Sequence, residues 1–441
     1  MLRRLWRRRL AYNRIGILLA VVGPGIIAAS ADNDASGILG YSQAGAVYKY
    51  GLLWILALST LALAVAQEIC ARMGAVTGKG LADLIREEYG PRITVFAMLV
   101  LLVANFATTV SEFAGILSAV QVFAGPWIRF VAVPLTALAV WLFVTRGSYR
   151  RIERILLGLS LVYLAYIVSA FLAHPPWLHV LKETVAPNLR ATFAERTAHF
   201  PKELAGVSPL SAYVLMIINV VGTTITPWGQ FYIQSTVRDK GVKAEEYGYT
   251  RIDVLAGAFF TNFIAFFIVV CCAATLFPML DLNDAGQAAL ALAPFAGKLA
   301  TILFAIGLFN ASCFGAITVP LSTAYAVTEA LGWESGLGRR VREAPLFIGI
   351  FTLLIVASAG IVVVVPTEKL GFLITLPNYV GGLLLPIILV LMQLLVNKRR
   401  LMGNYVNGRG YNWLAWITAV ALIALSLMAA WAAIKSMVSG G

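Results

Sequence analysis

Eleven long apolar runs, separated by short polar segments, make up most of the chain. A helix of about 17 to 25 apolar residues crosses a bilayer and satisfies its own backbone hydrogen bonds in lipid. The pattern predicts membrane helices over residues 15–46, 51–74, 93–123, 129–145, 152–173, 209–237, 252–277, 296–331, 344–365, 368–396 and 412–434. We therefore expect an all-α polytopic membrane protein with eleven transmembrane helices.

Composition and charge support this interpretation and add an orientation. Of the 441 residues, 60% are hydrophobic and 12% are charged, whereas soluble domains carry about 25% charged residues. The net charge is +13, and 25 of the 34 Lys and Arg lie in the N-terminal arm and the loops after every second run. We call that face the basic side. The positive-inside rule predicts a cytoplasmic N-terminus and an extracellular or periplasmic C-terminus in the cell (inner) membrane. The charge is then a topology signal and an attraction to the lipid bilayer, which excludes nucleic acid as the partner.

The first run contains two carboxylates at mid-membrane depth, Asp32 and Asp34, within the stretch from Gly23 to Gly37. Each charge at that depth costs about 3 kcal/mol on insertion scales, and Asp, Asn, Ser and Gly favour turns over helix interiors. We expect the helix to unwind here. Unwound backbone at that depth requires surrounding protein or a watery cavity.

The sixth run contains a second predicted break, between Gly222 and Gln230. Pro227 removes a backbone donor and clashes with the preceding turn, and Gly229 adds a flexible point. Trp228 lies in this break, where it would narrow a cavity or form a gate. A third, local break is expected in the tenth run at Pro377, with Asn378 as a candidate lining residue.

Breaks in runs one and six predict two repeats of five spans, the second inverted because five is odd. Repeat one covers about 15–173, an extracellular loop 174–208, repeat two about 209–396, and an extra helix about 412–434. Such repeats place a substrate between the two breaks near the bilayer midplane. All of this forms a single transmembrane domain, 1–441.

The residues at the two breaks offer oxygen atoms and neither imidazole nor thiol. This chemistry suits a hard cation such as Mg²⁺. Asp34 is the expected anchor, while Asp32 fits a ligand or a helix-cap role equally well. Facing hydroxyl and amide donors are Thr223, Thr224, Thr226 and Gln230. The alternative is a polar contact that only holds the helix bundle together, in which Glu112 of the third run could take part.

Other polar residues in the runs have more than one explanation. Gln67 and Glu68 are expected near the basic end of the second run, with Glu68 in an ion pair with a nearby basic loop. Asn310, Thr323 and Glu329 of the eighth run line a path or hydrogen-bond across helices.

The segment from Gln67 to Arg86, QEICARMGAVTGKGLADLIR, resembles the second-helix and loop signature of the NRAMP divalent-metal transporters. The stretches GPG at 23–25 and QAGA at 43–46 match the surroundings of that family's first broken helix. The resemblance covers about spans one to ten. It implies a transporter with a LeuT-type inverted repeat (helices 1–5 and 6–10) and broken helices 1 and 6, and not an enzyme. It places Asp34 on the family's metal-binding aspartate, Glu112 on a proton-linked glutamate, and the carbonyls of Ala31 and Thr223 toward the ion.

The departures from the family pattern share a direction. The metal-binding asparagine becomes Gly37 and the methionine becomes Thr226. The sixth-helix histidines are replaced by Trp228 and, nearby, by Gln234, and a third-helix aspartate becomes Thr109. The ninth run has no basic residue. Loss of a thioether removes a filter against hard cations. The pattern is similar to the NRAMP-related magnesium transporters of prokaryotes.

These observations predict a divalent cation uptake carrier for Mg²⁺ and also Mn²⁺, moved as a partly hydrated ion by alternating access without obligatory proton coupling. The predicted metal ligands are Asp34, Thr226, Gln230, Ala31 and Thr223. The metal is substrate, so no cofactor is expected, and no obligatory protein partner is evident. Two alternatives stay open: a proton-coupled Mn²⁺/Fe²⁺ importer, and a Na⁺-coupled organic-solute symporter of the same fold.

Overall fold

The computed structural model describes residues 24–147, 149–199, 209–279, 282, 285–291, 293–336 and 342–439. Regular structure in these ranges is helical, without strands. The α-helices are α3 (Pro24–Asp32), α4 (Ala35–Tyr48), α5 (Leu53–Thr77), α6 (Leu81–Gln121), α7 (Arg129–Arg146), α8 (Tyr149–Ser160), α9 (Leu164–Leu172), α10 (Trp177–Val185), α11 (Leu189–His199), α12 (Pro209–Thr224), α13 (Pro227–Lys240), α14 (Tyr247–Thr275), α15 (Ala285–Ala291), α16 (Ala293–Leu331), α17 (Pro345–Val364), α18 (Leu370–Val396), α19 (Arg399–Met402) and α20 (Arg409–Ser439). Residues 15–23 of the first predicted span lie outside the described ranges.

The first break falls where the sequence predicts it. α3 ends at Asp32 and α4 begins at Ala35. Asp34 is the N-cap of α4: its backbone is extended, and its side chain accepts a hydrogen bond from the Gly37 amide. A capping aspartate satisfies a backbone donor that would otherwise lack a partner at the start of a helix. Asp34 therefore starts α4, which fixes the position of its own carboxylate.

The second break lies between Thr224, the end of α12, and Pro227, the start of α13. Thr226 is the N-cap of α13, and its hydroxyl accepts from the Gly229 amide at 3.3 Å. Pro227 occupies the first position of α13, where a missing N–H costs nothing and the fixed φ suits a helix. The proline that ends the sixth span's first half thus also starts its second half.

The third predicted break is wrong. α18 runs without interruption from Leu370 to Val396, with Pro377 inside it. Neighbouring groups can compensate for a membrane proline. One turn before the proline, the Ser111 hydroxyl of α6 donates to the Ile374 carbonyl at 3.1 Å and so ties α18 to α6 there.

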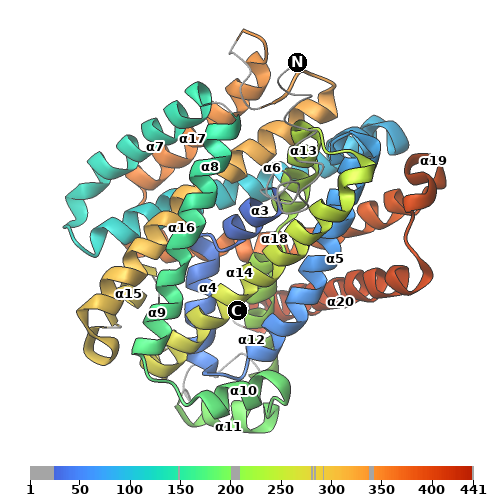
Figure 1. Cartoon of the computed structure of the whole chain (residues 1–441). Coiled ribbons are helices and arrows are strands. Elements are labelled where there is room, and N and C mark those ends of the chain that lie inside the picture. The colour runs from blue at the N-terminus through green and yellow to red at the C-terminus, as the bar shows by residue number, and fades with distance from the viewer. Residues whose placement is uncertain are drawn as a thin grey trace, which may run out of the picture.

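Ten helices in the described residues are long and apolar enough to cross a membrane. α3 and α4, with 9 and 14 residues, are each too short to do so and form one interrupted span only together. The predicted count of eleven depends on this pair. Figure 1 shows α3 and α4 in the middle of the bundle, surrounded by longer helices.

Glycines let the helices that carry the breaks approach closely. A Cβ on Gly25 of α3 would lie 2.6 Å from the Val254 Cα of α14, and one on Gly222 of α12 would lie 2.0 Å from the Asn378 carbonyl oxygen of α18. Small residues serve this purpose in membrane helix packing. The Asp253 carboxylate accepts from the Gly25 amide at 2.7 Å and so caps the start of α3.

The two ends of the bundle differ. The segment predicted as the loop 174–208 contains α10 and α11, which lie together at one end (Figure 1). There Lys49 pairs with Glu195 at 2.8 Å. The other end, where α13 finishes, is the basic side. Its Arg238 pairs with Glu329 of α16 at 2.8 Å and with Asp83 of α6 at 3.6 Å.

Candidate functional site

The Asp34 carboxylate is buried at the first break with half of its acceptor capacity unused. Its Oδ1 accepts from the Ser36 hydroxyl and the Gly37 amide, both at 2.6 Å. Its Oδ2 is buried and receives no hydrogen bond from a hydroxyl, an amide or a basic side chain, and the carboxyl within hydrogen-bond reach of Asp34 is that of Glu112. Among the described residues no Lys or Arg pairs with it. A buried, uncompensated carboxylate oxygen is costly and is therefore an attractive position for a cation.

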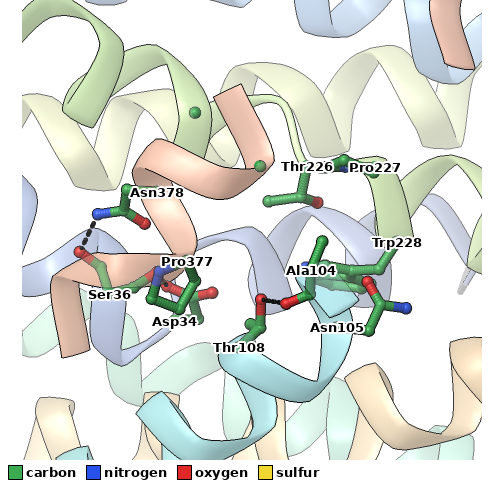
Figure 2. A pocket seen from close by; sticks show the side chains of 12 residues that line it. Asp34, Ser36, Ala104, Asn105, Thr108, Thr226, Pro227, Trp228, Pro377 and Asn378 are labelled. Atoms are coloured by element: carbon green, nitrogen blue, oxygen red, sulfur yellow. Dashed lines mark hydrogen bonds between the residues drawn. The ribbon is translucent and has the colours of Figure 1, made fainter. Parts of the chain in front are cut away.

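Asp34 lines a small cavity between the two breaks (Figure 2). Its walls come from α4, α6, the α12–α13 break and α18, and they include Ser36, Asn105, Thr108, Thr226, Trp228 and Asn378. The polar atoms of these side chains are oxygens and nitrogens, and no thioether, thiol or imidazole lines the cavity. The space in it is about that of one water-sized sphere.

Two further oxygens beside Asp34 are buried and unpartnered. The Thr223 hydroxyl has no partner and lies 2.8 Å from the place of a Cβ on Gly37. Asn378 donates to the Ser36 carbonyl at 2.9 Å and to Asn219 at 2.8 Å, which leaves its Oδ1 free. The prediction that Asn378 lines the site is confirmed, although α18 is not broken there.

Ala31 and Thr223 present carbonyls that their helices do not use. The residue four positions after Thr223 is Pro227, which has no N–H to donate. The residue four positions after Ala31 is Ala35, whose amide donates to Glu112 at 3.3 Å. Both carbonyls belong to the C-terminal end of a half-helix, where the helix dipole favours a cation.

Thr226 and Gln230, predicted to face Asp34, make their direct contacts around Asp32. The Thr226 hydroxyl donates to Asp32 Oδ1 at 2.8 Å, and the Gln230 amide donates to the Thr226 carbonyl at 3.4 Å. Thr226 also lines the cavity of Asp34, so it stands between the two carboxylates. The predicted oxygen set is thus divided between two acidic residues.

Gln67 of α5 contacts the first break, a role that the sequence did not predict. Its Nε2 donates to Asp32 Oδ2 at 3.0 Å. Glu68 does form an ion pair, but its partner at 3.2 Å is Arg72 of the same helix and not a loop residue.

Glu112 approaches the first break from α6. Its Oε2 accepts from the Ala35 amide at 3.3 Å, next to Asp34, and its Oε1 has no partner. The described residues contain no group of three or more His, Cys, Asp or Glu that could hold a metal ion together. An ion at either aspartate would therefore take its remaining ligands from hydroxyl, amide, carbonyl or water oxygens.

The span-eight residues hydrogen-bond across helices. Asn105 of α6 donates to Thr323 at 2.8 Å, Asn310 to the Leu159 carbonyl at 3.2 Å, and Ser235 to Glu329 at 2.7 Å. Of these, Asn105 also lines the cavity, as does Thr108. Neither residue could be singled out from the sequence, because a single polar side chain in an apolar run is common in helix packing.

Comparison with known proteins adds the family. The profile described as "Natural resistance-associated macrophage protein-like" matches residues 25–432. The chain belongs to this family. It is an NRAMP-type membrane transporter and not an enzyme.

The divalent metal cation transporter MntH of Pectobacterium carotovorum subsp. carotovorum (strain PC1) is 27% identical over 422 residues, covering 93% of this chain and 94% of that protein. A crystal structure of the Eremococcus coleocola manganese transporter is similar with a TM-score of 0.76 at 24% identity, covering 93% of this chain and 86% of that one. The nucleobase-cation-symport-1 transporter Mhp1 is similar with a TM-score of 0.56 at 16% identity, covering 95% and 91%. These structures confirm the LeuT-type fold of the NRAMP chain.

Proposed function

We propose that this NRAMP chain takes up divalent metal cations, Mg²⁺ above all and also Mn²⁺, as partly hydrated ions by alternating access. The observation that carries the proposal is the unpartnered Asp34 Oδ2 in a buried cavity between the two half-helix breaks. Relatives along almost the whole length are named for divalent metal cations. The Na⁺-coupled organic-solute alternative has less support, because the relatives that match almost the whole chain are named for divalent metal cations.

The chemistry of the cavity supports Mg²⁺ over softer metals. Its lining offers carboxylate, hydroxyl and amide oxygens without a sulfur ligand. Hard cations prefer such oxygens, and Mg²⁺ keeps several waters because it loses them reluctantly. A hydrated ion needs more room than this conformation offers, so the halves of spans one and six must separate for it to enter. Ser36 and Gly37 present little side-chain bulk to oppose that widening.

The direction of transport follows from charge. An ion with two charges gains about 4.6 kcal/mol per 100 mV on entering a negative cytoplasm, since each charge contributes about 2.3 kcal/mol. No second ion is then needed for accumulation. We place the basic side in the cytoplasm and the carrier in the inner membrane. α17 contains no ionisable residue that could relay a proton.

The deciding experiment is Mg²⁺ uptake into proteoliposomes by Asp34→Asn. Asparagine caps helices as well as aspartate, so α4 should keep its start while the anchoring charge is lost. We expect uptake to fall to the level of empty liposomes. Glu183→Gln on α10, which removes a carboxylate far from the breaks, is the matched control. Uptake by Asp34→Asn equal to that of the wild type would exclude Asp34 as the anchor.

A proton-coupled Mn²⁺/Fe²⁺ importer is the second candidate, and Glu112 favours it. Its unpartnered Oε1 beside Asp34 is a group that could exchange a proton. A pH-sensitive dye inside the same liposomes separates the two. Proton entry in fixed proportion to metal entry, abolished by Glu112→Gln, would favour coupling. Metal entry without acidification supports uncoupled uptake.

A further inference from the structure

We propose that Asp32 anchors a second cation subsite, completed by Gln67 and Gln230, through which the ion passes between Asp34 and the basic side. This inference rests on the proposed function and deepens it. It assigns to Asp32 a role of its own, distinct from capping a helix or supporting the Asp34 site.

The oxygen atoms around Asp32 form a set with unused acceptors. Asp32 is 1% exposed, and each of its carboxylate oxygens accepts one hydrogen bond, from Thr226 at 2.8 Å and from Gln67 at 3.0 Å. An ionised carboxylate has about four acceptor positions, so capacity remains on both oxygens. The side-chain oxygens of Gln67 and Gln230 are buried and have no partner.

The Gln67 oxygen is close enough to share an ion with Asp32. The oxygen and nitrogen of one amide are about 2.3 Å apart, which puts this oxygen at most about 5.3 Å from Asp32 Oδ2, and a small rotation of the amide shortens that distance. Two ligands on opposite sides of a hard cation are separated by about 4 to 5 Å. The Gln230 amide is held against Thr226, whose hydroxyl touches Asp32. One ion, with waters, could therefore contact all three side chains.

Charge balance points the same way. In the described part of the chain, the ion pairs lie toward the helix ends, at residues such as Lys49, Arg72 and Arg238, and none includes Asp32. Its two partners, a hydroxyl and an amide, are neutral donors. A carboxylate within the membrane without a basic partner marks an ion path more often than a structural contact.

The topology places the subsite on the exit side of the cavity. Asp34 lines the cavity and Asp32 does not. Thr226 lines the cavity and also donates a hydrogen bond to Asp32. Asp32 is the last residue of α3, and Thr226 precedes α13, which leads to Lys240 on the basic side. The C-terminal end of α3 adds the negative end of its dipole. An ion released by Asp34 toward that side meets Asp32 next.

The test uses the full-length protein in two measurements. Binding of Mn²⁺ to the protein in nanodiscs is detected by electron paramagnetic resonance. Transport is measured as Mg²⁺ uptake into proteoliposomes. We expect the wild type to bind two ions per chain. Asp34→Asn should lose the tighter ion. Asp32→Asn should keep that ion, lose the weaker one, and lower the maximal uptake rate about tenfold, because a charged contact to the passing ion is lost. Its half-saturating Mg²⁺ concentration should change less than about twofold.

Two further variants distinguish the loss of a ligand from misfolding. Asp32→Glu keeps the carboxylate and should retain the second ion, which distinguishes ligand loss from misfolding. Gln67→Leu should weaken the second ion and leave the first. Equal stoichiometry and uptake in Asp32→Asn and wild type would overturn the subsite. Loss of both ions in a folded Asp32→Asn would overturn it too, because Asp32 would then belong to the Asp34 site. If the wild type binds two ions but transports neither, the proposed function fails and with it the passage through Asp32, whereas Asp32 remains a second binding site.

Discussion

The ion-pair network at the basic end of the bundle should control opening toward that side. Arg238 of α13 pairs with Glu329 of α16 at 2.8 Å, with Asp239 at 2.9 Å and with Asp83 of α6 at 3.6 Å. The Glu329 side chain is 1% exposed and also accepts from Ser235 at 2.7 Å. The network ties α13, which follows the second break, to two helices outside the breaks. It must separate if α13 moves away from them.

We predict that Arg238→Ala opens this end. Removing one partner of a buried pair costs about 3 to 5 kcal/mol, because the other charge stays buried without compensation. In the open state water solvates the Glu329 carboxylate, so the variant destabilises the closed state relative to the open state. A shift of about 3 kcal/mol is roughly a hundredfold, so a protein that is about 99% closed would become about half open.

Pulsed electron resonance between spin labels at Lys240 and Glu334 measures this opening directly. Both sites flank the network, since Arg238 also donates to Ser335 at 3.1 Å. The variant should add a longer distance that the wild type lacks. Arg238→Ala with Glu329→Gln should return toward the closed distance, because no buried charge is left unpaired. An unchanged distance in Arg238→Ala, together with a lowered melting temperature, would refute the reasoning: the network would then persist in both states.

Three further predictions concern selectivity and packing. Thr226→Met should shift competition uptake from Mg²⁺ toward Mn²⁺, since a thioether favours the softer ion; an unchanged ratio would count against the oxygen-only argument. Gly222→Ala should destabilise the protein by about 1 to 3 kcal/mol in thermal melts and abolish uptake, because a Cβ would lie 2.0 Å from a carbonyl oxygen of α18. Gly349→Ala, with open space around the glycine in α17, is its neutral control. Asp253→Ala should cost about 1 to 2 kcal/mol through the lost cap of α3, and a melting temperature equal to that of the wild type would contradict that role.

The sequence predicted both breaks to within a few residues because their causes are local. Asp34 and Thr226 are cap residues, and Pro227 is compatible with a helix only at its start. Polar residues are also easy to recognise in a membrane span, because the residues around them are apolar. The same logic fails at Pro377, because whether a proline breaks a membrane helix depends on its neighbours in space.

The division of the oxygen set between Asp32 and Asp34 could not be predicted in the same way. Thr226 is 194 residues from Asp32 and 192 from Asp34 along the chain, so sequence spacing alone cannot decide which carboxylate it contacts. That choice depends on how α13 packs against α3 and α5. Gln67 enters the set for the same reason, because its contact with Asp32 depends on how α5 packs against α3.

The carbonyls of Ala31 and Thr223 differ in how much of their environment the sequence predicts. Both are freed from their helices, but by different means. Thr223 loses its donor through Pro227, a fact written in the sequence four residues away. Ala31 loses its donor because Glu112, 77 positions after Ala35, takes the Ala35 amide. The free carbonyl of the sixth span is therefore a property of one peptide segment, whereas that of the first span exists only in the folded bundle. A change at Glu112 should consequently disturb metal binding through the Ala31 carbonyl even if no proton ever passes through its carboxylate.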